Sequence, residues 1–223
     1  RTTVVPPEDA MRSAVVTALC YALFAINATI AIGAMAWTIV NRRTTVVRLS
    51  QPSFLVTIAA GTFLSSSTIL FVVMGDENDH EGLAYQGLYP AANFACRAMV
   101  FTYTAGFVLT FAPLFAKLWR VHKIMSGSKT LRRIRVRSSF LIGIVAGLLF
   151  VDMTIASVWT ALDPLHYVRI VVNFDRQGLP VASEGSCQSN NSTPFVIAIL
   201  IAHLAMLLYG VTLCYQTRNI NSV

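Results

Sequence analysis

Five long apolar stretches alternate with polar loops along the 223-residue chain. A transmembrane helix needs about 20 predominantly apolar residues, and each stretch reaches that length. The pattern therefore predicts an all-α fold, a polytopic bundle of transmembrane helices. The predicted spans are residues 14–40, 52–74, 96–118, 138–161 and 194–215.

Composition supports an integral membrane protein over a soluble one. The chain is 55% hydrophobic and 12% charged, whereas soluble domains carry about 25% charged residues. The net charge of +7 would suggest a nucleic-acid partner if the basic residues covered a soluble surface, but here they cluster beside apolar spans. We therefore expect no nucleic-acid partner. Residues 1–12 are interpreted as an extracellular linker, and residues 13–223 as one transmembrane domain.

The charges of the loops alternate from one side of the bundle to the other. The loops after the first and third spans, together with the tail, hold 12 of the Lys and Arg residues and no Asp or Glu. The opposite side holds 5 basic residues and nine of the ten acids. The positive-inside rule places the basic side in the cytoplasm, so the N-terminus is predicted to lie outside.

The predicted outer side carries residues suited to extracellular chemistry. Cys96 and Cys187 both fall there, where oxidising conditions allow a disulfide. Asn190 and Asn191 each begin an Asn-x-Ser/Thr pattern, which makes them glycosylation candidates. Pro194 follows the second pattern and the membrane is close, so the sequence leaves open whether either asparagine is modified.

Asn27 is the one strongly polar side chain of the first predicted span, and Asp152, in the fourth, is the one acid well inside a span. Burying an acid in a membrane costs at least about 2.5 kcal/mol, so Asp152 must face the interior of the bundle or be protonated. We expect an intramembrane polar network that joins Asp152 to Asn27 or to the Ser65–Ser67 cluster. A proton relay, as in a transporter, would need more ionisable groups at this depth, and only His203 is a candidate.

A pair of glycines in the fourth span, Gly143 and Gly147, has the spacing of a helix-packing motif. We expect it to serve close packing within the chain, with a dimer contact as the alternative. The sequence contains no catalytic constellation, no phosphate-binding glycine loop and no paired-cysteine metal motif. We therefore predict neither an enzyme nor a bound metal or cofactor.

The most informative motif runs from Phe115 to His122 (FAKLWRVH), at the inner end of the third span. It resembles the inner end of the third helix of metabotropic GABA-B-type receptors, which are class C G-protein-coupled receptors. Further motifs are similar to the same family in the same order, and the resemblance covers nearly all of residues 14–223. These are Leu148–Asp152 (LLFVD), Trp159–Leu165 (WTALDPL) and Thr217–Asn219 (TRN).

The resemblance implies a receptor of the plasma membrane that transmits an extracellular ligand signal to a heterotrimeric G protein, as a homodimer or heterodimer. The family has seven helices and a ligand-binding extracellular domain. This chain shows five spans and no such domain, and we favour an incomplete sequence as the explanation. The alternatives are a multi-span transporter or channel, and a truncated receptor subunit that does not signal.

The resemblance also implies roles for individual residues. Cys96 and Cys187 occupy the places of the family's disulfide. Lys117 occupies the place of a lysine that, in the family, forms an inactive-state ion lock with an acid on helix six. The alternative is that the Lys117 side chain only extends to the membrane interface, without a specific partner. The predicted G-protein-facing residues could instead serve topology and membrane lipid. They are Arg120, Lys123, Arg132, Arg133, Arg135 and Arg137.

Overall fold

A computed structural model describes residues 14–77, 90–128, 138–174 and 180–218 of the chain. The described part contains six α-helices and one two-stranded sheet. The helices are α1 (Ala14–Val40), α2 (Thr45–Leu49), α3 (Pro52–Glu77), α4 (Pro90–Ser128), α5 (Ser138–Leu162) and α6 (Ser192–Arg218). The strands are β1 (His166–Phe174) and β2 (Pro180–Gln188).

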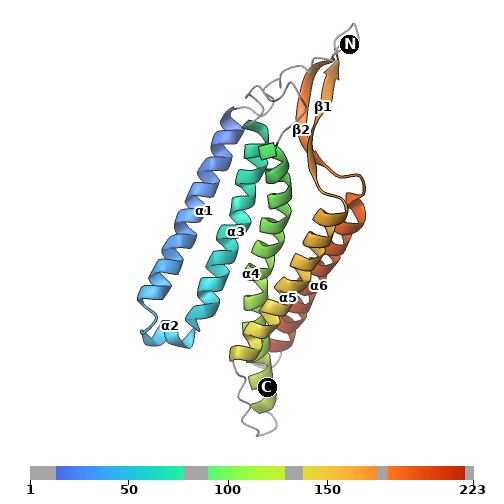
Figure 1. Cartoon of the computed structure of the whole chain (residues 1–223). Coiled ribbons are helices and arrows are strands. Elements are labelled where there is room, and N and C mark those ends of the chain that lie inside the picture. The colour runs from blue at the N-terminus through green and yellow to red at the C-terminus, as the bar shows by residue number, and fades with distance from the viewer. Residues whose placement is uncertain (1–13, 78–89, 129–137, 175–179, 219–223) are drawn as a thin grey trace.

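The five long helices lie side by side, and each runs opposite in direction to the one before it (Figure 1). α4 is the central helix, because it packs against α3 on one side and against α5 and α6 on the other, whereas α1 packs on α3. The short α2 joins α1 to α3 at the end of the bundle opposite the β-hairpin (Figure 1).

The outer surface of the bundle is apolar. Large hydrophobic side chains are exposed along the long helices, among them Leu23 and Ile30 on α1, Phe150 on α5 and Leu208 on α6. Exposing such a surface to water is unfavourable, whereas contact with the hydrocarbon core of a bilayer is favourable. The five long helices each have the length and composition to cross a membrane. The predicted all-α transmembrane bundle, and with it the location in a membrane, is confirmed.

Glycines bring α3 and α4 unusually close together. A Cβ atom added to Gly61 would lie 2.6 Å from the backbone nitrogen of Thr110, and one added to Gly106 would lie 2.5 Å from the backbone nitrogen of Ser65. Real Cβ atoms do not approach backbone this closely, so only glycine fits at either position. Small residues let membrane helices pack at short range, and these two positions account for the tight α3–α4 contact.

The Gly143/Gly147 pair does not serve packing within the described chain, contrary to the prediction. Both glycines are exposed, and a Cβ atom added to either would meet nothing within 4 Å. The reason is the rotational setting of α5, which points Leu141 and Val145 inward and so turns the glycine face outward. Gly143 and Gly147 are each two residues from Val145, so they lie on the face of α5 opposite to the inward-facing Leu141 and Val145.

The polar loop predicted between the fourth and fifth spans contains an antiparallel β-hairpin that sequence reasoning missed. β1 pairs with β2 from His166 opposite Gln188 to Phe174 opposite Pro180, with irregularities near Asn173. The hairpin extends beyond the ends of the helices (Figure 1). The β-branched residues of Val168–Val171 were the available signal, because such side chains favour strands.

The long helices also extend past the apolar stretches that predicted them. α4 begins at Pro90 rather than at residue 96 and continues to Ser128, and α6 continues to Arg218. A helix end that reaches water needs no apolar residues, because water satisfies its terminal backbone groups. Hydropathy therefore locates the membrane-embedded part of a helix and underestimates its length.

Candidate functional site

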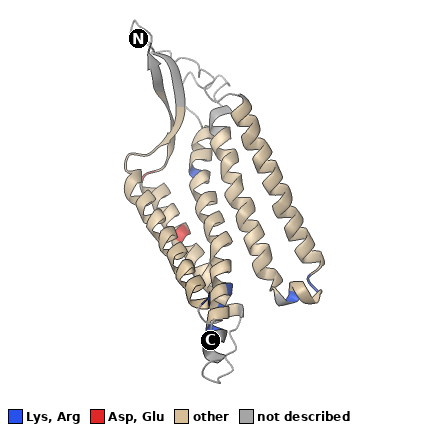
Figure 2. Cartoon of the chain, turned by 180° about the vertical axis from the view of Figure 1, so that it is seen from behind, with Lys and Arg blue, Asp and Glu red and all other residues tan. Residues whose placement is uncertain are grey.

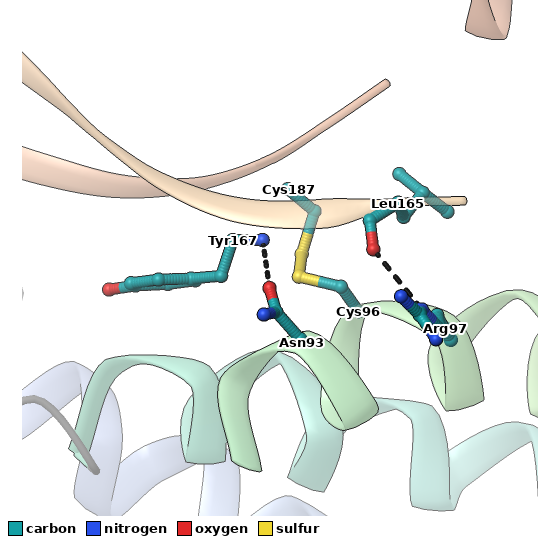
Figure 3. Close-up of a disulfide and its surroundings, with 6 residues drawn as sticks. All are labelled: Asn93, Cys96, Arg97, Leu165, Tyr167 and Cys187. Atoms are coloured by element: carbon teal, nitrogen blue, oxygen red, sulfur yellow. Dashed lines mark hydrogen bonds between the residues drawn. A yellow bond between two sulfur atoms is a disulfide. The ribbon is translucent and has the colours of Figure 1, made fainter. Parts of the chain in front are cut away.

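A disulfide joins the hairpin to the central helix at the outer end of the bundle. Cys96, in the second turn of α4, is bonded to Cys187 near the end of β2, with their Cα atoms 5.7 Å apart (Figure 3). Cys96 is 1% exposed. The bond links positions 91 residues apart in sequence, so it holds the loop between α5 and α6 onto α4.

Hydrogen bonds on either side of the disulfide reinforce this attachment (Figure 3). The backbone N–H of Tyr167 donates to the side-chain oxygen of Asn93 over 2.7 Å. Arg97, which is on the same helix as Asn93, donates its Nε–H to the carbonyl oxygen of Leu165 over a longer distance of 3.5 Å. The hairpin base is therefore fixed to the first turns of α4 by covalent, polar and apolar contacts.

Asp163 ties the end of α5 to the start of α6. Its carboxylate accepts hydrogen bonds from the Ser189 hydroxyl at 2.5 Å, from the Asn191 N–H at 2.6 Å and from the Asn190 N–H at 3.2 Å. The Ser189 hydrogen bond, followed by the Asn191 backbone bond, holds the pKa of Asp163 below its ordinary value of 3.8. The carboxylate is therefore ionised at neutral pH, the form that accepts all three bonds. From the sequence, Asp163 was placed only within the WTALDPL motif, and no contact was predicted for it.

The two glycosylation candidates lie at this junction. Asn190 and Asn191 are exposed, and each donates its backbone N–H to Asp163. Exposure is required for modification, but the backbone of both residues is held in the turn that precedes α6. Glycosylation of either asparagine stays a prediction.

A buried polar pair lies halfway along the bundle. Asp152 of α5 and His203 of α6 share a hydrogen bond of 2.7 Å between Oδ2 and Nε2. Each residue is only 3% exposed. The imidazole ring stacks on the ring of Phe107 from α4, with centroids 3.9 Å apart and an interplanar angle of 13°. Three helices therefore meet at this pair.

The expected network between Asp152 and Asn27 is not formed, and that prediction was wrong. Asn27 Nδ2 instead donates to the hydroxyl of Ser66, which links α1 to α3. The reason is the packing order of the helices: α1 lies on α3, whereas α5 lies on α4 and α6. The two intramembrane polar residues therefore belong to separate contacts in different halves of the bundle.

The inner end of the bundle is basic. Figure 2 shows the described Lys and Arg residues mainly at the end opposite the hairpin. Lys117 is half-buried on α4, and it makes no ion pair with any residue in the described ranges. Farther along α4, Arg120 is half-buried and Lys123 is exposed. The remaining predicted G-protein-facing residues lie outside the described part of the chain: Arg132, Arg133, Arg135 and Arg137.

Two aromatic side chains near Lys117 pack α4 against its neighbours. Phe115 of α4 lies against Gly210 of α6, where an added Cβ atom would collide with the phenyl ring. Trp119 contacts Phe140 at the start of α5, with ring centroids 5.7 Å apart. Phe115 and Trp119 are four residues apart and share one face of α4, whereas Lys117, two residues from each, lies on the other face.

Comparison with known proteins identifies relatives over most of the chain. The chain is 28% identical over 196 residues to gamma-aminobutyric acid type B receptor subunit 2 of Rattus norvegicus, an alignment that covers 83% of this chain and 19% of that protein. It is 26% identical over 195 residues to probable G-protein coupled receptor 156 of Homo sapiens, covering 84% of this chain and 23% of that protein. The chain thus spans about a fifth of the length of these relatives.

A third relative matches a shorter part of the chain. Metabotropic glutamate receptor-like protein E of Dictyostelium discoideum is 26% identical over 119 residues, which cover 52% of this chain and 13% of that protein. The family model described as "7 transmembrane sweet-taste receptor of 3 GCPR" matches residues 10–223. Together with the five-helix membrane bundle, this match shows that the chain belongs to the seven-transmembrane family of class C G-protein-coupled receptors.

Proposed function

We propose that the chain is part of a receptor of the plasma membrane that passes an extracellular signal to a heterotrimeric G protein. The observation that carries the proposal is the family match over residues 10–223. The same match does not favour a transporter, a channel or a subunit that does not signal. Dimerisation with a second receptor subunit, and binding of the ligand by an extracellular domain, belong to the same proposal.

The arrangement of the bundle suits such transmission. At the outer end, the disulfide and Asp163 connect the hairpin rigidly to α4, α5 and α6. At the inner end, Phe115 and Trp119 of α4 pack against α6 and α5 respectively. A signal at the outer end would act by favouring one of two arrangements of these helices, which is a shift of populations between existing states.

The basic loop between α4 and α5 supplies the first test. Replacing Arg132, Arg133 and Arg135 by glutamine in the full-length protein is expected to lower G-protein activation several-fold. These cations lie on the predicted cytoplasmic side, where charge complementarity speeds association with a partner protein. Nucleotide exchange on G protein in cell membranes gives the readout, at matched surface levels. A matched replacement of Arg42 and Arg43, in the loop after α1, controls for loss of positive charge in general.

Two other outcomes are informative. Unchanged nucleotide exchange would remove these residues from the contact with G protein. Failed or inverted insertion, seen by protease protection, would mean that the loop acts chiefly as a topological anchor.

Lys117 is proposed as one half of an ion pair that resists opening of the inner face. Its position on α4 supports this role, because it is half-buried near the membrane edge and lacks an acidic partner among the described residues. An ammonium at this depth gains from a carboxylate partner. The Lys117→Ala receptor is expected to show basal G-protein activation raised about fivefold, the lower end of typical coupling energies. The Arg48→Ala receptor, which loses an exposed cation of α2 at the same end of the bundle, should match the wild type.

A Lys117→Ala receptor with unchanged basal activation would contradict the lock and leave Lys117 as a side chain that snorkels. Lys117→Arg keeps the charge, so it should behave like the wild type if an ion pair is the cause.

A further inference from the structure

The buried pair of Asp152 and His203 lies between two apolar clusters that join α5 to its neighbours. Toward the outer end, Ala156 of α5 and Ile199 of α6 belong to the cluster beneath the hairpin. Toward the inner end, Val145 of α5 belongs to a second cluster, against which Met206 of α6 packs. The pair therefore separates an outer contact region from an inner one.

The pair is isolated from other charges in the described part of the chain. Phe107, which stacks on His203, is ten residues from Arg97 in one direction and ten from Lys117 in the other. At a rise of 1.5 Å per residue, each charge is roughly 15 Å away along the axis of α4. Tyr103 is the other titratable side chain that faces His203, with ring centroids 5.7 Å apart. Asp152 and His203 thus depend on each other for hydrogen bonding.

A hydrogen bond and an apolar contact constrain a helix pair in different ways. Apolar burial is non-directional and depends mainly on the area removed from water, so it does not by itself require one particular atomic geometry. A hydrogen bond weakens steeply when its distance or angle departs from the optimum. Its loss at this depth would leave two polar groups unsatisfied among apolar side chains. Asp163 ties the outer ends of α5 and α6 together, and the bond of 2.7 Å between Asp152 and His203 adds a directional contact halfway along the same two helices.

The stacked ring extends the constraint to the central helix. Phe107 and His203 are nearly parallel, at 13°, so a rotation of α6 would unstack them while it stretched the bond to Asp152. We infer that Asp152 and His203 form a clamp that holds α6 in one register against α5 and α4, and that this clamp disfavours the rearrangement of the inner end that activates G protein. The regulatory half of this inference rests on the proposed function, whereas the register half does not.

The register is tested by a distance measurement on the full-length protein in lipid nanodiscs. Spin labels are placed on Cys214 of α6, which is exposed, and on Ile142→Cys of α5, after replacement of other reactive cysteines. Pulsed electron paramagnetic resonance then gives the distribution of distances between the inner ends of the two helices. The clamped protein is expected to give one narrow distribution.

Four variants of the pair and one control variant separate the clamp from general loss of structure. Asp152→Leu and His203→Leu each leave one polar group buried without a partner, so they remove the clamp and also destabilise the fold. The double leucine variant leaves no orphaned group and should fold. Asp152→Asn keeps a hydrogen-bonding partner for His203. Thr154→Leu is the matched control, since Thr154 is exposed on α5 and bonds only to Phe150 of its own helix.

The clamp predicts a broadened distance distribution for the double leucine variant and a narrow one for Asp152→Asn and for Thr154→Leu. Basal activation of G protein should rise about threefold in the double leucine variant, the factor that a typical interhelical hydrogen bond supports. An unchanged distribution in that variant overturns the clamp. A broadened distribution with unchanged basal activation overturns its regulatory role. A wild-type protein that activates no G protein under any condition refutes the proposed function, and the distance measurement still decides the clamp.

Discussion

Removal of the disulfide, by Cys187→Ser, is expected to lower the melting temperature of the detergent-solubilised protein by at least several degrees. Loss of a native disulfide costs about 2–5 kcal/mol in small domains. Here the bond joins α4 to β2 across 91 residues. Its loss would leave the hairpin attached to α4 by the Asn93 and Arg97 hydrogen bonds and the apolar contacts of Leu165 and Tyr167. Serine suits this position because Cys187 is only partly buried, so the new hydroxyl adds little desolvation cost.

The measurement is size-exclusion chromatography after heating, followed by fluorescence of a fused reporter. Cys214→Ser is the matched control, because Cys214 is a free, exposed cysteine and its replacement should change nothing. Reduction of the wild-type protein should reproduce the Cys187→Ser result. Equal melting temperatures for the reduced and oxidised protein would mean that the polar and apolar contacts suffice to hold the hairpin.

Gly106→Val is expected to destabilise the helix bundle strongly. The new side chain would need space that the backbone of Ser65 on α3 already fills, at 2.5 Å from the Cβ position. Backbone cannot rotate aside as a side chain can, so α3 and α4 must separate. Overpacking of this kind costs about 1–3 kcal/mol and at times more, and here it would also disturb the glycine contact at Gly61.

The expected readout is a strong reduction in correctly folded protein at the cell surface and in the yield of monodisperse protein. Gly143→Val is the matched control on α5, because nothing lies within 4 Å of its Cβ position. Equal yields for the two variants would show that the α3–α4 interface can widen without penalty. A damaging Gly143→Val would instead reveal a partner on the exposed face of α5.

The features that depend on local composition were predictable. Five apolar stretches of the required length identify the five long helices, because a bilayer imposes its thickness on any helix that crosses it. The FAKLWRVH motif led to the family by resemblance, and the family match over residues 10–223 agrees with it. The hairpin was missed, although Val168–Val171 carried a strand signal, because a polar loop between spans gives no reason to expect a sheet.

The features that depend on helix rotation and neighbourhood were not predictable. Asp152 was expected to join Asn27 or the Ser65–Ser67 cluster, and His203 was named only as a candidate for a proton relay. The observed partner follows from which helices pack together, since α5 lies against α6 and α1 lies against α3. In the same way, the spacing of Gly143 and Gly147 indicated a packing face, while the inward side of α5 is set by Leu141 and Val145.

By itself, the sequence determined that the described part of the chain holds five membrane-spanning helices and which side of the bundle is basic. Hydropathy and loop charge are summed over many residues, so they can be predicted without knowing any single contact. Only the tertiary structure decided that Asp152 bonds to His203, that Gly61 and Gly106 rather than Gly143 and Gly147 bring helices together, and that the hairpin is attached to α4. A pairwise contact depends on the rotation of two helices about their axes, and in a span that is apolar on every face the sequence pattern leaves that rotation unspecified.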